Sequence, residues 1–205
     1  MRSLDTSPYE TVYRRLAASV GAGAPRVIGL AGAGRGQGTT TLAVGLARAA
    51  LSHGAGTVLV VDAATRGRSA ARLLARDLPG SARAENVDGL PGELRIGGAG
   101  VPALFSLAPD GGNGMHDDAL REACAALFAR FDFVVVDTGD VASVVPARWR
   151  TLVDCLVLVV DTNRETIESL SRLRKDLDDR GLSCDGFVLN KRRFHVPGFL
   201  YRLVR

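Results

Sequence analysis

Residues 26–53 read RVIGLAGAGRGQGTTTLAVGLARAALSH, and this stretch decides the fold. Its first six residues, 26–31, form a short apolar run that predicts a buried strand. Glycines then occupy alternate positions 32, 34, 36 and 38, and residues 39–53 carry apolar side chains at helical spacing. A strand, a glycine-rich loop and a helix in this order predict the opening of an α/β unit, with the helix N-terminus facing the loop.

The same alternation of elements continues along the chain. Apolar runs predict strands at residues 57–62, 104–107, 133–137, 156–160 and 187–189, and helical spacing predicts helices at residues 7–20, 68–75 and 117–130 and before Gly181. Such alternation predicts an α/β fold: a parallel, doubly wound sheet with helices on both faces. We expect one domain over residues 1–205, with no clear period in residues 78–114.

Two capping patterns mark predicted helix starts. Ser7 precedes Pro8, and Glu10 completes a capping box for the N-terminal helix. Thr162 with Glu165 makes a second box, which is expected to open the last helix.

Composition indicates a folded, non-membrane chain. Of 205 residues, 46% are hydrophobic and 23% charged, which is ordinary for a soluble globular protein. No apolar run approaches the roughly 18–20 residues of a membrane span, and no signal peptide opens the chain, so we expect a cytoplasmic protein. Cys124, Cys155 and Cys184 lie far apart, which argues against a disulfide framework or a zinc site. Cys155 and Cys184 start apolar runs and are expected to be buried free thiols.

The C-terminal residues 191–205 form a basic tail. They hold five Lys or Arg residues and no acid, interleaved with aromatic and aliphatic side chains, in a chain of net charge +4. Such a tail suits an acidic surface, either a lipid membrane or a partner protein. The alternative is a last segment that packs on its own domain.

The glycine-rich loop predicts a phosphate cradle, because a helix N-terminus offers free N–H groups and a positive dipole. The candidate nucleotide-binding residues are Gly34, Arg35, Gly36, Gln37, Gly38, Thr39, Thr40 and Thr41. Residues 38–40 stand where a Walker loop has Gly-Lys-Ser/Thr, so Thr39 replaces the lysine and Thr40 could offer its hydroxyl to Mg²⁺. Arg35 is a candidate substitute cation. A glycine turn kept only for the fold is the alternative.

Asp62 and Asp137 end the second and third predicted long strands. The carboxyl ends of parallel strands face the ligand crevice, so both acids are expected near Thr40, where they could hold Mg²⁺. The alternative is that each aspartate merely caps a loop.

Several stretches together resemble the bacterial tyrosine kinases (BY-kinases) of exopolysaccharide export, which belong with MinD- and ParA-like proteins to the deviant-Walker family. Residues 27–47 (VIGLAGAGRGQGTTTLAVGLA) resemble its Walker A segment, residues 59–66 (LVVDAATR) its Walker A′ segment and residues 131–140 (FDFVVVDTGD) its Walker B segment. Residues 156–190 resemble its final helix and strand, and residues 13–16 (YRRL) its N-terminal helix.

The resemblance implies ATP or ADP and Mg²⁺ as cofactors. It also implies that Asp62 and Asp137 are the catalytic and metal-binding carboxylates, that Asn190 contacts adenine and that Tyr201 is a phosphoacceptor. The implied partners are the cytoplasmic segment of a membrane polysaccharide co-polymerase (a Wzz-like chain-length regulator) and further copies of the chain in a ring.

The chain departs from the family pattern at coupled positions. These are Thr39 for the Walker A lysine, Ala64 for the second A′ aspartate, Gly139 and Asp140 for the Walker B prolines, Thr11 and Ala17 in the N-terminal pattern, and a tyrosine cluster reduced to Tyr201. Losses of this kind favour relaxed catalysis, and the broken N-terminal pattern predicts a ring weaker than the family's, with the chain as a monomer or dimer.

Our first hypothesis is therefore a degenerate, BY-kinase-like regulator of exopolysaccharide synthesis or export, with weak or no ATP turnover. An active tyrosine autokinase with Tyr201 as acceptor is the alternative, and a MinD- or ParA-like ATPase is the second alternative. Nucleic acid is not an expected partner, because the ParA signature lysines are absent and no stacking aromatics interleave the central basic residues.

Overall fold

The computed structural model of the chain describes residues 7–20, 26–64, 70–75, 77–78, 82–107, 115–143 and 145–191. The strands are β1 (Arg26–Gly32), β2 (Val58–Asp62), β3 (Arg83–Val87), β4 (Leu90–Ile96), β5 (Ala103–Leu107), β6 (Phe133–Asp140), β7 (Cys155–Asp161) and β8 (Gly186–Asn190). The helices are α1 (Ser7–Ser19), α2 (Thr39–Ser52), α3 (Ala70–Leu74), α4 (Asp117–Phe128), α5 (Val145–Arg150) and α6 (Ile167–Asp179). The predicted phosphoacceptor Tyr201 and nearly all of the predicted basic tail, residues 192–205, lie outside the described residues.

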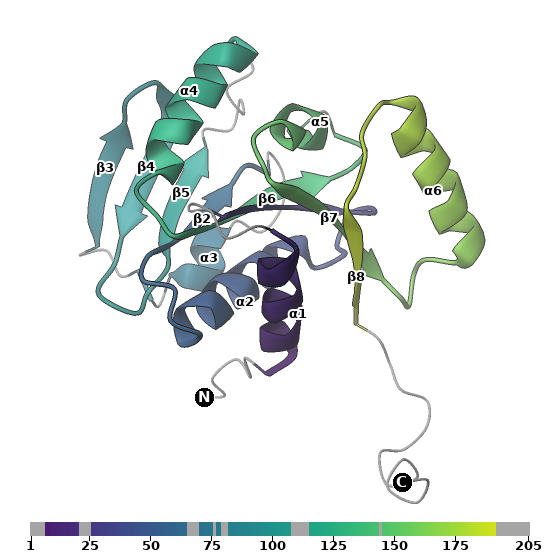
Figure 1. Cartoon of the computed structure of the whole chain (residues 1–205), viewed down its shortest axis with the longest axis horizontal. Helices are drawn as coiled ribbons and strands as arrows, with labels where there is room; N and C mark the ends of the chain where they lie inside the picture. The colour runs from purple at the N-terminus through teal and green to yellow at the C-terminus, as the bar shows by residue number, and fades with distance from the viewer. Residues whose placement is uncertain are drawn as a thin grey trace, which may run out of the picture.

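The strands form one eight-stranded sheet in the order β3-β4-β5-β2-β6-β1-β7-β8 (Figure 1). Neighbouring strands from β5 to β8 are parallel, as predicted. The expectation of a wholly parallel sheet is wrong at one edge, where β3 and β4 form an antiparallel hairpin that pairs with β5. Every residue of β3 is at least partly exposed, so this edge lacks the apolar run that marks the central strands.

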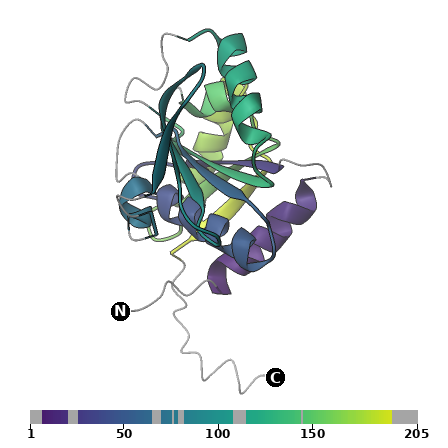
Figure 2. The same cartoon turned by 90° about the vertical axis from the view of Figure 1, so that its left-hand side faces the viewer.

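Helices cover both faces of the sheet, which confirms the doubly wound architecture. Helices α1, α2 and α3 lie on one face, and α4, α5 and α6 lie on the other (Figures 1 and 2). On the first face the core includes Leu46 of α2 against Ile28 and Val60 of the sheet. On the second face Trp149 of α5 is buried in the other core cluster.

Helix α1 packs on α2 where α2 carries a glycine. A Cβ built on Gly45 would lie 2.5 Å from Cδ1 of Tyr9, so only glycine admits the tyrosine ring at this approach. Farther along α1, the ring of Tyr13 stacks on His53 at 5.5 Å and meets Phe133 edge-on at 5.3 Å. These contacts fix α1 beside the helix that follows the glycine-rich loop.

The last helix begins four residues later than the capping pattern predicted. Thr166 caps α6: its hydroxyl accepts the Ser169 N–H at 3.2 Å, and the Ser169 hydroxyl accepts the Thr166 N–H at 2.9 Å. The predicted box at Thr162 is therefore wrong, because Glu165 instead binds Gln37 of the glycine-rich loop.

The thiols of Cys124 and Cys155 are buried, as expected for Cys155, and burial raises the pKa of Cys124 to about 12. Cys184 is only half-buried, which corrects that expectation, because it lies in the loop before the edge strand β8. Across the described ranges, none of the helices is long and apolar enough to cross a bilayer.

Candidate functional site

The glycine-rich loop joins β1 to α2 and folds over a hollow of about 490 Å³. The hollow is lined by Gly34, Arg35, Gly36, Gln37, Gly38, Thr39, Thr40, Thr41, Ala64, Asp137, Gly139, Asp140 and Lys191. All eight predicted loop residues and Asp137 are therefore brought together around one space. Asp62 and Asn190 do not line it.

Two loop glycines adopt backbone angles that favour glycine. Gly36 has φ of 74° and Gly38 has φ of 92°, both in the left-handed region. A Cβ on Gly38 would also lie 2.4 Å from Nδ2 of Asn190. The loop needs glycine at position 38 for both reasons, and Gly38 is the N-cap of α2.

Asp137 lies at the floor of the hollow and is 1% exposed. Its Oδ1 accepts the Gly139 N–H at 3.1 Å, whereas its Oδ2 has no hydrogen-bond partner among the described residues. Burial raises the pKa of Asp137 to about 6, opposed by the Thr40 hydroxyl and the Gly139 N–H, and the charge of Asp62 adds to the rise. A buried carboxylate oxygen without a partner is costly, and a cation or a proton would remove that cost.

Asp62 is 7% exposed and has a clear local role. Its Oδ2 accepts the N–H of Ala70, the first residue of α3, at 2.8 Å. This bond is of the kind that the capping alternative for this strand-end acid predicts. Asp62 acts on the hollow through its charge, which raises the pKa of Asp137.

The donor set fits Mg²⁺ held jointly with phosphate. Thr40 and Asp137 line the hollow and offer oxygen atoms, the ligands Mg²⁺ prefers. Among the described residues, no group of three or more His, Cys, Asp or Glu side chains could hold a metal by itself. Phosphate oxygens and water would have to complete the coordination.

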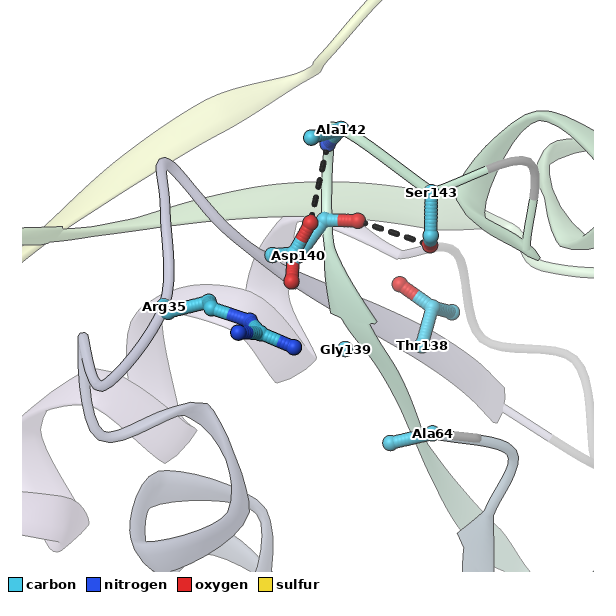
Figure 3. A pocket seen from close by; sticks show the side chains of 7 residues that line it. All are labelled: Arg35, Ala64, Thr138, Gly139, Asp140, Ala142 and Ser143. Atoms are coloured by element: carbon cyan, nitrogen blue, oxygen red, sulfur yellow. Dashed lines mark hydrogen bonds between the residues drawn. The ribbon is translucent and has the colours of Figure 1, made fainter. Parts of the chain in front are cut away.

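Arg35 extends into a neighbouring hollow of about 450 Å³, toward Gly139 and Asp140 (Figure 3). The two hollows share these three residues and Ala64. Asp140 is held at the rim, since its Oδ1 accepts the Ala142 N–H at 3.1 Å. Arg35, the substitute cation predicted from the sequence, therefore lines both hollows.

The main-chain carbonyls of loop residues 35–37 are held by side chains from the ends of the neighbouring strands β7 and β8. Arg164 donates to the carbonyl of residue 35 at 3.1 Å, Lys191 to that of residue 36 at 2.6 Å, and Asn190 to that of residue 37 at 2.8 Å. Asn190, predicted to contact adenine, thus uses its amide to hold the loop. Because these carbonyls already accept hydrogen bonds from side chains, the loop keeps its shape without a ligand.

The buried side chain of Gln37 connects the glycine-rich loop to β7 through hydrogen bonds. The sequence did not predict this structural role. Gln37 is 2% exposed, its Nε2 donates to Glu165 at 2.9 Å, and its Oε1 accepts the Asp161 N–H. A glutamine in a glycine-rich loop carries no local signal for these contacts, because both partners lie more than 120 residues away in sequence.

No protein-family profile and no curated protein sequence matches the chain. Solved structures do. The kinase domain of the Escherichia coli tyrosine kinase ETK is similar at a TM-score of 0.72 and 19% identity, over 94% of this chain and 79% of that one. The tyrosine kinase domain of BceF is similar at a TM-score of 0.70 and 20% identity, over 91% of this chain and 77% of that one.

A third similar structure is the septum site-determining protein MinD of Pyrococcus horikoshii OT3, complexed with Mg-ADP. Its TM-score is 0.57 and its identity 20%, over 87% of this chain and 76% of that one. A ParA family ATPase from Chlorobium tepidum is similar at a TM-score of 0.57 and 18% identity, over 82% of this chain and 75% of that one. The chain therefore has the P-loop α/β fold that the kinase domains of bacterial tyrosine kinases share with MinD- and ParA-type ATPases.

Proposed function

We propose that this chain binds ATP or ADP with Mg²⁺ beneath the glycine-rich loop and serves as a regulator in exopolysaccharide synthesis or export, with weak or no ATP turnover. The observation that carries the binding proposal is the Oδ2 atom of Asp137. It is buried, unpartnered among the described residues, and part of the same hollow as the loop and Thr40.

Binding is supported by the form of the cradle. The loop leads directly into the first turn of α2, whose free N–H groups and dipole favour phosphate. Glycine at position 38 lets the backbone approach an anion closely. Bound Mg²⁺ supplies charge that offsets the phosphates, and Thr40 and Asp137 are the residues that would hold it.

Weak turnover is supported by Thr39. This residue lies in the hollow at 9% exposure, where a Walker loop has its lysine, and a hydroxyl carries no charge to balance the β- and γ-phosphates. Loss of one preorganised donor of this kind commonly costs on the order of 2–4 kcal/mol in transition-state stabilisation.

The place in exopolysaccharide export is supported by the ordered Walker-like stretches and by the fold shared with tyrosine kinase domains. In this proposal the chain works at the cytoplasmic face of the membrane, and the basic residues 191–205 contact the cytoplasmic segment of a polysaccharide co-polymerase. Binding of that segment to the full chain, compared with a chain truncated after residue 191, which keeps the lysine of the hollow, tests the partner. Equal binding by both would contradict the role given to the tail.

Calorimetric titration with ATP and with ADP, each with Mg²⁺, tests the nucleotide site. We expect weak binding by the unaltered chain and binding at least about tenfold tighter by Thr39→Lys, the scale of one charge-assisted hydrogen bond. Asp137→Ala should reduce the gain in nucleotide affinity that Mg²⁺ gives. Absence of binding by both the unaltered chain and Thr39→Lys would overturn the proposal.

Incubation with labelled ATP and Mg²⁺ separates the regulator from an active autokinase. If the chain is a regulator with weak or no turnover, we expect little label on the protein and little ADP. Turnover by the unaltered chain equal to that of Thr39→Lys, with label lost in Tyr201→Phe, would establish the autokinase instead.

A further inference from the structure

Lysine is rare in this chain. Of 26 Lys and Arg residues only two are lysines, Lys175 and Lys191. Lys175 is an exposed residue of α6. Lys191 follows β8 directly and lines the hollow beneath the glycine-rich loop. The position of Lys191 was predicted from sequence only as the start of a basic tail.

The structure holds the Lys191 backbone in an unusual conformation. Its φ is 55°, the one positive φ of a non-glycine residue in the described part of the chain. The Lys191 N–H donates to Oδ1 of Asn190 at 2.9 Å, and its carbonyl accepts from Nδ2 of Asn163 at 2.7 Å. Left-handed conformations of residues other than glycine are uncommon and gather at functional sites.

This backbone places the side chain beside Gly38, the residue before the position that lacks a charge, and in the same hollow as Thr39. Cε of Lys191 lies 3.8 Å from the point where a Cβ on Gly38 would be, and Thr39 is the next residue. The ammonium donates to the Gly36 carbonyl at 2.6 Å and to Oδ2 of Asp161 at 2.8 Å. It is 43% exposed, so the side chain has room to turn.

We propose that Lys191 supplies, from the end of the last strand, the positive charge that a nucleoside di- or triphosphate needs and that Thr39 no longer provides. The inference rests on the proposed nucleotide site and names a residue of it. The ammonium is a compact point charge on a stem with several rotatable bonds, so it can follow a polyphosphate without movement of the backbone.

Asp161 is the competitor for this charge. It is 2% exposed, and the hydrogen bond from Lys191 is the largest of the causes that lower its pKa to about 2. A phosphate group and Asp161 would therefore share or exchange the ammonium. Removing the aspartate charge in Asp161→Asn should tighten nucleotide binding several-fold, whereas a merely structural Lys191–Asp161 pair predicts weaker binding as the loop loosens.

Affinity for Mg-ADP in four variants tests the charge. Lys191→Met should weaken Mg-ADP binding by about tenfold, the scale of a charge-assisted hydrogen bond. Lys191→Arg keeps the positive charge and should keep most of the affinity. Lys191→Gly fits the left-handed backbone, so it removes the charge without adding backbone strain. Lys175→Met is the matched control, since it removes the only other lysine from a helix surface, and it should bind like the unaltered chain.

A labelling experiment gives a readout that does not depend on turnover. Amine acetylation, measured by mass spectrometry on the full chain, compares Lys191 with Lys175 in one sample. Mg-ADP should protect Lys191 and leave Lys175 unchanged, and AMP, which lacks the β-phosphate, should protect much less. Equal labelling of Lys191 with and without Mg-ADP, at concentrations where calorimetry shows binding, would overturn the inference.

The remaining outcomes separate this inference from the proposed function. Unchanged Mg-ADP affinity in both Lys191→Met and Lys191→Gly would overturn the role of Lys191 and leave the nucleotide site standing. Binding by Thr39→Lys alone, with none by the unaltered chain, would show that Lys191 does not replace the missing charge. Loss of binding in every variant, Thr39→Lys included, would overturn both.

Discussion

The side-chain amide of Asn190 donates a hydrogen bond to the main-chain carbonyl of Gln37 at 2.8 Å, so the end of β8 holds the loop that precedes α2. Residues 153 positions apart in sequence thereby set the shape of the cradle. The close approach depends on Gly38, because any side chain there would enter the space of the Asn190 amide.

Gly38→Ala should lower the free energy of unfolding more than Gly54→Ala does. Both glycines have a left-handed φ, 92° and 88°, but a Cβ on Gly38 meets Asn190 at 2.4 Å, while no atom of the described residues lies within 4 Å of one on Gly54. Backbone strain alone should cost about 1 kcal/mol at either site, and the clash adds to it only at Gly38. Urea denaturation of both variants gives the comparison; equal losses would contradict the close approach.

Asp137→Asn should change how stability depends on pH. In the unaltered chain the folded pKa of about 6 exceeds the unfolded value, so the folded state binds more protons and stability falls as pH rises from about 4 to 6. The amide does not titrate, so the variant should lack this fall and be more stable at pH 7.5 by on the order of 1–3 kcal/mol.

Denaturation from pH 4 to 8 in buffers containing EDTA measures the Asp137 effect without divalent metal. Asp132→Asn is a useful control, because hydrogen bonds from Thr57 lower the pKa of that exposed carboxyl, and its loss should not remove the fall between pH 4 and 6. Identical pH profiles for the unaltered chain and Asp137→Asn would refute the assignment.

Gly45→Ala should destabilise the chain although alanine favours helices. The new Cβ would lie 2.5 Å from the Tyr9 ring, and overpacking of this kind costs roughly 1–3 kcal/mol, more than the gain of about 1 kcal/mol in helix propensity. In a double-mutant cycle, Tyr9→Ala should cancel most of the penalty of Gly45→Ala. Additive losses would show that α1 does not pack on α2 at this point.

Gln37→Leu should lower stability by about 1–3 kcal/mol, because it leaves the buried N–H of Asp161 without its acceptor. It should also weaken nucleotide binding, since the loop loses its tie to β7. Thermal unfolding and Mg-ADP titration of the same sample measure both effects. Gln37→Glu keeps an acceptor for the N–H and should recover part of the stability.

Sedimentation velocity over a wide concentration range tests assembly. We expect a monomer or dimer, because Thr11 and Ala17 stand where the bacterial tyrosine kinases that the sequence resembles have charged residues in their N-terminal helix. A stable octamer would contradict this prediction.

The central part of the fold was predictable from sequence. Strands β1, β2, β6 and β7 are buried on both faces, so each is a continuous apolar run that can be read without knowledge of its neighbours. The glycine-rich loop and Asp137 were identified in the same way, although β6 continues past Asp137 and ends at Asp140. Strand β3 was missed because it is a polar edge strand whose pairing with β4 leaves no apolar signature.

Local patterns were ambiguous where distant residues compete for the same side chain. Two pairs look like helix starts in sequence: Thr162 with Glu165, and Thr166 with Ser169. The helix begins at the second pair, because Glu165 is bound to Gln37 in the loop that follows the neighbouring strand β1. Likewise the sequence predicts that Asp62 binds a metal, and the structure adds that its Oδ2 accepts a hydrogen bond from the N–H of Ala70 in α3.

The amino-acid sequence alone determined the α/β class, the cradle and the missing lysine, because each depends on residue types within a few neighbouring positions. Only the tertiary structure decided that Asp137 has a buried oxygen without a partner in the described chain and that Lys191 lines the same hollow as Thr39. Both are consequences of strand order: β8 pairs with β7 and β7 with β1, and this brings the residue after β8 over the loop that follows β1.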